Sequence, residues 1–314
     1  MKTIELSGQQ GRIDKVLTDI LQDSRSTIQK LIQDGLVMVD GQVVKSNFKV
    51  QGSEVIHIKK ANQTSEEELQ LIAQDIPLDI IYEDEDILVI NKAKGMVVHP
   101  SKGHPDGTLM NAVAYYLGDK MMSDDSQSLR PGLVHRIDKD TSGLLVLAKH
   151  KRAHETLAKQ LSDHSMLRIY EAIVFGHFKA PHGTIDIPLR RQDHNRLKYG
   201  GHKEGKPAIT HFRVLAESNE NMSLVECHLE TGRTHQIRAH MEHIGHPIVG
   251  DPLYQTGRQA SVPEYFHNNE GQLLHAKKLT LKHPRNGDLM TFEAPFPKSF
   301  TDVSKKLFKS ESID

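Results

Sequence analysis

The segment HRIDKDTSGLLVLAK, residues 135–149, holds a dense group of side chains that could do acid–base or electrostatic chemistry. Basic, acidic and hydroxyl groups stand side by side at His135, Arg136, Asp138, Lys139, Asp140, Thr141 and Ser142. The apolar run 144–148 follows at once, and such a run bounded by turn residues is typical of a buried strand. Gly143 joins the two parts, so this loop is suited to hold one side chain rigidly. The alternative is a surface loop whose Asp, Thr and Ser residues cap neighbouring elements.

The histidines indicate a second possible chemistry, metal binding, to which the single cysteine adds no support. His235, His240, His243 and His246 fall in one short segment, and His150 and His154 have the i, i+4 spacing of a helical metal pair. The HExxH pattern is absent, so a zinc hydrolase is a rival interpretation and we predict no bound metal. Cys227 stands alone, which excludes an internal disulfide and a multi-thiolate metal site. It lies in the alternating run SLVECHLE, which predicts a half-buried strand thiol rather than a nucleophile.

The segment 135–149 resembles the active-site motif of the RluA-type pseudouridine synthases, HRLD-x-x-TSGLL-x-x-AK, with Ile137 for Leu as the one departure at a fixed position. The resemblance places the catalytic aspartate on Asp138. It also implies that Tyr170 stacks on the target base, that Arg238 faces the carboxylate, and that Arg136 fills the hole left by a flipped nucleotide. Taken alone, Tyr170 fits a core tyrosine and Arg238 a structural ion pair, and Arg233 competes for the role of Arg238.

The implied reaction turns uridine into pseudouridine by breaking the N1 glycosidic bond and rejoining the ring through C5, so no cofactor is expected. It needs an ionised carboxylate, and a nearby arginine stabilises that form of a buried aspartate. Asp138 as nucleophile and Asp138 as base at the ribose both stay open. A tyrosine face can hold the detached base, and the flipping of a base out of folded RNA requires compensation for lost stacking. The alternative is a non-catalytic, RNA-binding ribosome assembly factor.

Residues 1–60 read as a small self-contained module. Helices are predicted over 13–21 and from the Ser24–Ser26 cap to Asp34, where Gly35 ends the second. Asp40-Gly41 predicts a tight hairpin, and residues 55–58 a further strand. RIDKVL, SRSTIQKLIQDGLVMVDG and VQGSEVIHI make this module similar to the S4 RNA-binding domain, which implies phosphate contacts at Arg25, Lys30 and Lys45.

Residues 61–75 form an acidic linker, and 76–314 the catalytic domain. Strands are predicted near 80–82, 87–90, 168–176 and 224–229, and helices around 109–117 and 150–162. Short turns between strands predict an α+β fold whose sheet is mixed and largely antiparallel, with the small α/β module in front. The family usually has Lys-Pro-x-Gly where this chain has residues 92–95, KAKG; loss of the proline predicts a looser loop without loss of activity.

Composition bounds the remaining possibilities. Hydrophobic residues make up 37% and charged residues 26%, as in a soluble globular protein, and the start of the chain has no export signal. We therefore expect a cytoplasmic monomer with no membrane partner. A net charge of −1 neither supports nor excludes RNA. The domain order is similar to that of the large-subunit ribosomal RNA synthases of the C and D types, and the motif spacing favours the D type, so the expected partner is ribosomal RNA or a ribosomal particle. The basic segment Arg190–Lys206 is either an arm that closes on RNA or a hairpin tip.

Overall fold

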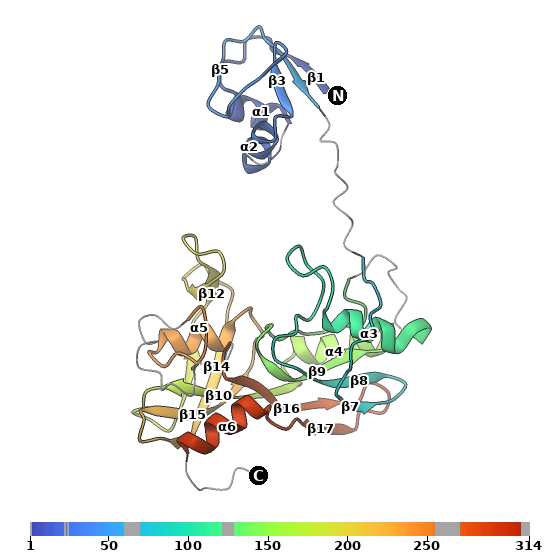
Figure 1. Cartoon of the computed structure of the whole chain (residues 1–314), viewed down its shortest axis with the longest axis vertical. Helices are drawn as coiled ribbons and strands as arrows, with labels where there is room; N and C mark the ends of the chain where they lie inside the picture. The colour runs from blue at the N-terminus through green and yellow to red at the C-terminus, as the bar shows by residue number, and fades with distance from the viewer. Residues whose placement is uncertain are drawn as a thin grey trace. The chain divides into compact units, whose positions relative to one another are not determined.

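The computed structural model describes residues 2–21, 23, 25–59, 70–120, 129–254 and 271–308. The chain splits into two compact units, Met1–Glu68 and Leu69–Asp314, each built around its own core (Figure 1). Most of the predicted linker lies outside the described residues, and residues 70–75 have no regular secondary structure.

The first unit is a small antiparallel sheet packed against two helices. Its elements are β1 (Lys2–Glu5), β2 (Gly11–Arg12), α1 (Ile13–Leu21), α2 (Arg25–Gln33), β3 (Val37–Val39), β4 (Gln42–Val43), β5 (Lys49–Val50) and β6 (Val55–Ile58). The four-stranded sheet has the order β1-β6-β3-β4, and β2 pairs with β5. Asp40 and Gly41 have φ angles of 46° and 80°, as the predicted tight hairpin requires. Ile13, Leu17 and Ile28 are fully buried in the core of this unit.

The second unit is built on one large sheet. Its strands are β7 (Ile80–Glu83), β8 (Ile87–Lys92), β9 (Ser142–Ala148), β10 (Leu167–Phe175), β11 (His182–Asp186), β12 (Leu189–Arg191), β13 (Tyr199–Gly201), β14 (Ile209–Glu217), β15 (Met222–Leu229), β16 (Leu274–Lys282) and β17 (Leu289–Glu293). The sheet order is β11-β14-β15-β10-β16-β9-β8-β7, with β17 also beside β16, and β12 pairs with β13 separately. Of the pairings described in this sheet, β9 with β16 is parallel and the others are antiparallel. The predicted α+β fold with a mixed, largely antiparallel sheet is confirmed.

Helices cover both faces of this sheet. They are α3 (Leu109–Leu117), followed by the short 3-10 helix η1 (Gly118–Lys120), α4 (Lys151–Ser162), α5 (Gln236–His243) and α6 (Lys298–Leu307). Helices α3 and α5 share one apolar cluster with Leu145 and Leu147 of β9, whereas α4 packs with Leu144 and Val146 of the same strand. Strand β9 is therefore buried on both faces, which explains why it reads as a continuous apolar run.

Cys227 differs from its prediction. It lies on β15 and is fully buried, not half-buried, because its side of the strand faces the cluster that α3 and α5 cover. Burial raises the pKa of the Cys227 thiol, so the side chain is a neutral core group.

Candidate active site

The loop that carries Asp138 is fixed at its far end by Gly143, the second residue of β9. Gly143 has a φ of +106°, and a Cβ atom there would lie 2.3 Å from the carbonyl oxygen of Ala276 on β16. Only glycine therefore allows β9 and β16 to approach as a parallel pair at this point. The backbone N–H of Thr141 donates to the carbonyl of Asp138 at 3.1 Å, which closes the turn between Asp138 and the strand.

Lys92, the last residue of β8, binds backbone carbonyl groups of the same loop. Its side chain is buried, and Nζ donates to the carbonyl oxygens of Ala93, Met96 and Lys139 at 2.7, 2.8 and 3.0 Å. Burial lowers the pKa of Lys92 to about 7, although the negative charges of Asp140 and Asp138 act to raise it. Three carbonyl acceptors match the three N–H donors of an ammonium group, so Lys92 ties the β8 end to the residue that follows Asp138.

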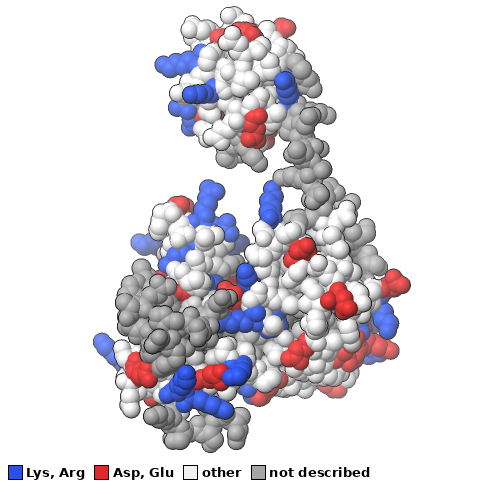
Figure 2. All heavy atoms as spheres, in the orientation of Figure 1, with Lys and Arg blue, Asp and Glu red and all other residues white. Residues whose placement is uncertain are grey.

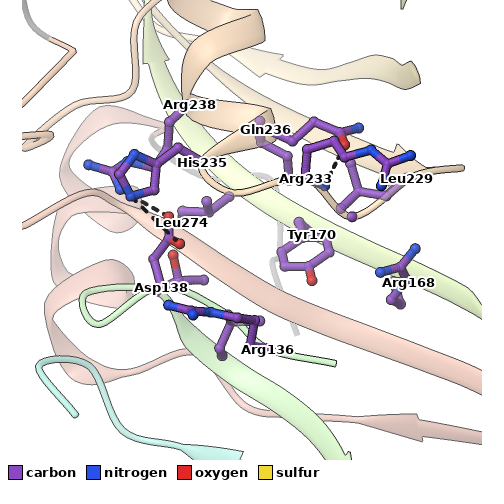
Figure 3. Close-up of a pocket in the computed structure, with 14 residues that line it drawn as sticks. Arg136, Asp138, Arg168, Tyr170, Leu229, Arg233, His235, Gln236, Arg238 and Leu274 are labelled. Atoms are coloured by element: carbon purple, nitrogen blue, oxygen red, sulfur yellow. Dashed lines mark hydrogen bonds and ion pairs between the residues drawn. The ribbon is translucent and has the colours of Figure 1, made fainter. Parts of the chain in front are cut away.

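Asp138 forms an ion pair with Arg238 of α5 (Figure 3). Arg238 Nη1 lies 2.9 Å from Asp138 Oδ2, while Nε and Nη2 donate to the two oxygens of Asp251 at 2.6 and 3.0 Å. Burial by itself lowers the pKa of Arg238, but the hydrogen bonds and charges of Asp251 and Asp138 outweigh it and hold that pKa above its ordinary value. Arg238 is thus a permanent cation, gripped on one edge by Asp251 and facing Asp138 with the other.

Tyr170 and Arg136 line the pocket into which Asp138 faces. Tyr170, on β10, is buried apart from its pocket side, and burial raises the pKa of its phenol, which therefore keeps its proton at neutral pH. Arg136 is exposed and lines the same pocket as Asp138, as the alternation of an extended segment predicts. Figure 3 shows the Tyr170 ring between the Asp138–Arg238 pair and Arg168. Of the two arginines that competed for the carboxylate, Arg238 contacts it, whereas Arg233 Nε donates to the carbonyl of Pro207.

His235 is a further neighbour of the carboxylate. Its Nε2 atom lies 4.0 Å from Asp138 Oδ1, and its Nδ1 atom lies 3.0 Å from the hydroxyl of Tyr254. That hydroxyl accepts the backbone N–H of Tyr199 at 2.8 Å, so its own proton is free to bond Nδ1. Burial lowers the pKa of His235 despite the nearby Asp138. The neutral ring with its proton on Nε2, directed at Asp138, fits these contacts.

Three other histidines of the rival zinc interpretation have separate partners. His240 bonds Thr210 Oγ1 and the carbonyl of Ile187, His246 bonds the carbonyl of Phe175, and His150 pairs with Asp86. Within the described ranges, the one group of ligand atoms close enough for a metal ion is Asp84, Asp86 and His283. Those side chains already bond one another, Arg285 and backbone N–H groups, as in an ordinary ion-pair network.

The three residues expected to contact RNA in the first unit have different surroundings. Arg25, on α2, is half-exposed and pairs with the fully buried Asp14 at 2.8 Å, so part of its guanidinium joins α2 to α1. Lys45 is exposed in the turn after β4. Lys30 lies on α2, and its side chain lies outside the described residues. Their roles in RNA binding stay predictions.

The basic segment Arg190–Lys206 contains a hairpin of β12 and β13. Arg190 pairs with Asp193 and Glu204 within it, and Leu197 is 68% exposed near the tip. The backbone N–H of Tyr199 bonds Tyr254, which anchors the hairpin beside the pocket residues. Figure 2 shows Lys and Arg side chains on this part of the second unit and along the hollowed middle of the same face.

Comparison with known proteins identifies the family. The sequence model of the RNA pseudouridylate synthases matches residues 86–243, and that of the S4 domain matches residues 11–56. An RNA pseudouridine synthase of Bacillus subtilis, YlyB, is 44% identical over 300 residues, which cover 95% of each chain. The chain belongs to the RNA pseudouridylate synthase family. It is an RNA-modifying isomerase of the RluA type with an N-terminal S4 domain, rather than the non-catalytic assembly factor considered as the alternative.

Two further relatives extend this result. Ribosomal large subunit pseudouridine synthase D of Escherichia coli is 42% identical over 300 residues, covering 93% of this chain and 89% of that one. The solved structure of human RNA Pseudouridylate Synthase Domain Containing 1 superposes with a TM-score of 0.56 and 25% identity, covering 72% of this chain and 86% of that chain. No helix among the described residues is long and apolar enough to cross a membrane.

Sequence reasoning missed several residues around the carboxylate. Asp251, Lys92, His235 as its neighbour and Arg168 were not singled out for these roles. Lys92 was visible in KAKG, but nothing in that pattern indicates that it reaches the carbonyl of Lys139. Asp251 lies in the loop after α5, and its alignment with Arg238 depends on the geometry of that loop.

Proposed function

We propose that this isomerase converts specific uridines of large-subunit ribosomal RNA to pseudouridine, with Asp138 as the catalytic carboxylate acting on a flipped-out nucleotide. The observation that carries the proposal is the ion pair of Asp138 with Arg238 at the wall of a pocket that Tyr170 also lines. The choice of RNA follows from relatives named as large-subunit synthases, such as the one from Escherichia coli. A monomer and a cytoplasmic location belong to the same proposal.

Each side chain has a defined part in this reaction. Arg238 stays protonated, so it stabilises a carboxylate on Asp138 and does not itself give up a proton. Attack by Asp138 on the sugar, or removal of a ribose proton by it, both require that ionised form. The glycosidic bond from C1′ to N1 breaks, a new bond joins C1′ to C5, C5 loses its proton and N1 gains one. Tyr170 supplies a flat face for the uracil while it turns, and such stacking contributes about 1–3 kcal/mol.

Arg136 is suited to compensate for base flipping. It is exposed at the pocket and two residues before Asp138, so it can enter the space that the extruded nucleotide leaves in the RNA stack. Flipping a base costs a few kcal/mol, part of which a stacked guanidinium would offset.

The test is pseudouridine formation in a transcribed large-subunit ribosomal RNA domain, mapped by chemical modification and reverse-transcriptase stops, with no added metal or cofactor. We expect stops at defined uridines with the wild type and near-total loss, at least about 10⁴-fold, with Asp138→Asn, because the amide cannot carry the required charge. Asp140→Asn is the matched control, since this carboxylate lies in the same loop but does not line the pocket. Stops that persist in Asp138→Asn would overturn the role of Asp138.

The choice of RNA is tested separately. If free RNA gives no stops, the assay is repeated on ribosomal particles from a strain that lacks the enzyme. The large-subunit target would be contradicted if the enzyme bound both the free RNA and the particles but modified neither. A synthase of known activity, assayed alongside, shows that the assay works.

A further inference from the structure

Arg168, on β10, is a buried arginine with no partner in the part of the chain that the structure describes. Its relative exposure is 7%, its Nε atom is shielded and unbonded, and no hydrogen bond or ion pair reaches its guanidinium. Arg238 is equally buried but bonds two carboxylates. An unpaired buried charge destabilises a fold, and natural proteins pair it or place it where a ligand supplies the opposite charge.

Gly232 makes room for this guanidinium. A Cβ atom on residue 232 would lie 2.7 Å from Arg168 Nη1. Gly232 is not among the residues with positive φ, so its backbone would accept other residues. The missing side chain therefore serves the space around Arg168 rather than the conformation of the loop.

Arg168 lies between the active-site pocket and a second, adjoining hollow. Arg136, Arg168, Gly232 and Arg233 line both. The second hollow is otherwise formed by the segment before Asp138, the end of α4, the start of β14 and the residues after β15: Val134, His135, Leu161, Ser162, His164, Pro207, Ile209, Glu230 and Thr231. Its lining holds three arginines and one carboxylate, and that carboxylate, Glu230, already bonds His211 at 2.6 Å. The hollow therefore has spare positive charge for an anion.

We propose that Arg168 binds a backbone phosphate of the RNA next to the target uridine, and that the hollow beyond it receives the strand that flanks the flipped nucleotide. This inference rests on the proposed RNA substrate and adds a phosphate site to it. Arg168 and Tyr170 are two residues apart on β10, on the same face and about 6–7 Å from each other. A base stacked on Tyr170 thus brings the sugar–phosphate backbone beside Arg168. The planar guanidinium suits two parallel hydrogen bonds to phosphate oxygens.

The test measures dissociation constants for the transcribed ribosomal RNA domain over a range of salt concentrations, with the full chain and its Arg168→Met, Gly232→Ala and Arg213→Met variants. Arg213 is the matched control, an exposed arginine paired with Glu226 and outside both hollows. We expect Arg168→Met to weaken binding about 10-fold and to reduce the slope of log Kd against log salt by about one. Gly232→Ala, which displaces the guanidinium without removing its charge, should change both quantities in the same direction. Arg213→Met should stay within about twofold of wild type.

Thermal unfolding separates phosphate binding from a structural role. Because Arg168 has no partner in the described chain, Arg168→Met should unfold at the same temperature as the wild type or a higher one. A lower unfolding temperature with unchanged affinity, or weaker binding with an unchanged salt slope, would overturn the proposal. Conversion of uridine is measured in parallel, so an RNA that binds through Arg168 yet is never modified counts against the proposed function alone.

The position of the phosphate can be tested once a converted uridine is mapped. In a short RNA that contains it, each phosphate near that uridine is replaced in turn by a neutral methylphosphonate. We expect one position beside the target uridine to weaken binding of the wild type but not of Arg168→Met. A sensitive position far from the target would contradict the assignment.

Discussion

Two carboxylates share the guanidinium of Arg238, and only one of them faces the pocket. Asp251 is fully buried and also accepts the backbone N–H groups of Leu253 and Tyr254, at 2.9 and 3.1 Å. Its position is therefore fixed by the loop after α5, and it fixes the guanidinium in turn. Asp251 acts on the chemistry through Arg238, as a positioning residue rather than a catalytic one.

Asp251→Asn should lower both activity and stability. The amide can still accept hydrogen bonds but removes the charge that balances Arg238, and breaking a buried pair costs about 3–5 kcal/mol. We expect kcat for pseudouridine formation to fall by about 10- to 100-fold, with a smaller change in KM. The reason is that a less firmly held Arg238 guanidinium orients the Asp138 carboxylate less well. The measurement is the steady-state rate of conversion over a range of RNA concentrations, which gives kcat and KM, alongside urea unfolding.

Glu226→Gln is the control for this variant. Glu226 pairs with Arg213, whose side chain is 63% exposed, and exposed ion pairs contribute only about 0–1 kcal/mol. Equal effects of the two substitutions would show that Asp251 acts through general charge balance, not through the geometry of Arg238.

At the residue scale, the sequence patterns indicated four of the residues that line the pocket. Asp138, Tyr170, Arg136 and Arg238 stand in or beside recognisable patterns, and the structure brings all four to one pocket. Arg168 is different, because nothing in RIYEAIV distinguishes a buried, unpaired arginine from one that pairs on the surface. Burial and partners depend on which loop crosses the strand end, which here is the one carrying Gly232.

The parallel pairing of β9 and β16 is the element on which the active-site loop depends. It is short, with Ser142 opposite His275 and Gly143 opposite Ala276. The Ser142 hydroxyl and His275 Nδ1 lie 2.9 Å apart, which adds a side-chain bond to the same junction. A small shift of β9 here would move Asp138 directly.

Gly143→Ala should disrupt this junction. The methyl group would lie 2.3 Å from a backbone oxygen of β16 and would also sit on a φ of +106°. Strained backbone and overpacking together destabilise by at least about 2 kcal/mol, so the urea midpoint should fall and conversion should be lost even where the protein remains folded. Gly103→Ala is the control, because a Cβ atom at residue 103 would have no neighbouring atom within 4 Å and the φ there is not positive. An unchanged midpoint for Gly143→Ala would show that β9 and β16 can separate without harm.

At the element scale, hydrophobic runs predicted most of the strands and helices that surround the site. The helices over 13–21 and 109–117 and the strand at 144–148 are found where periodicity places them. The order of strands could not be predicted, because β9 meets β16 only through a contact between residues more than a hundred positions apart. Alternation of side chains indicates which face of a strand is buried but not which strand lies beside it.

In the two units of the molecule, different causes shift the pKa values of titratable side chains. In the first, the buried Asp14 accepts hydrogen bonds from Arg12, Gln29 and Arg25, which outweigh burial and hold its pKa below the ordinary value. In the second, burial lowers the pKa of several histidines, among them His135, to about 3, and His99 and His275, each to about 4. His135 Nε2 accepts the backbone N–H of Val146 at 3.2 Å, a contact that requires the unprotonated atom.

Mild acid should therefore loosen the second unit and spare the first. A histidine whose folded pKa is depressed stabilises the fold above its unfolded pKa near 6.5, and this stability is lost as pH falls toward the folded value. Each such histidine removes on the order of 1–2 kcal/mol by pH 5. Asp14 also has a depressed pKa, but its contribution is lost only below the unfolded carboxyl pKa near 4, so the first unit keeps it.

Hydrogen exchange of the full chain, corrected for intrinsic rates, should show lower protection at pH 5 than at pH 7.5 in β9 and β16 but not in α1. His275→Asn should reduce this difference in protection between the two pH values. His104→Asn, at an exposed site, should leave it unchanged. An equal loss of protection in both units at pH 5 would contradict the assignment to the buried histidines.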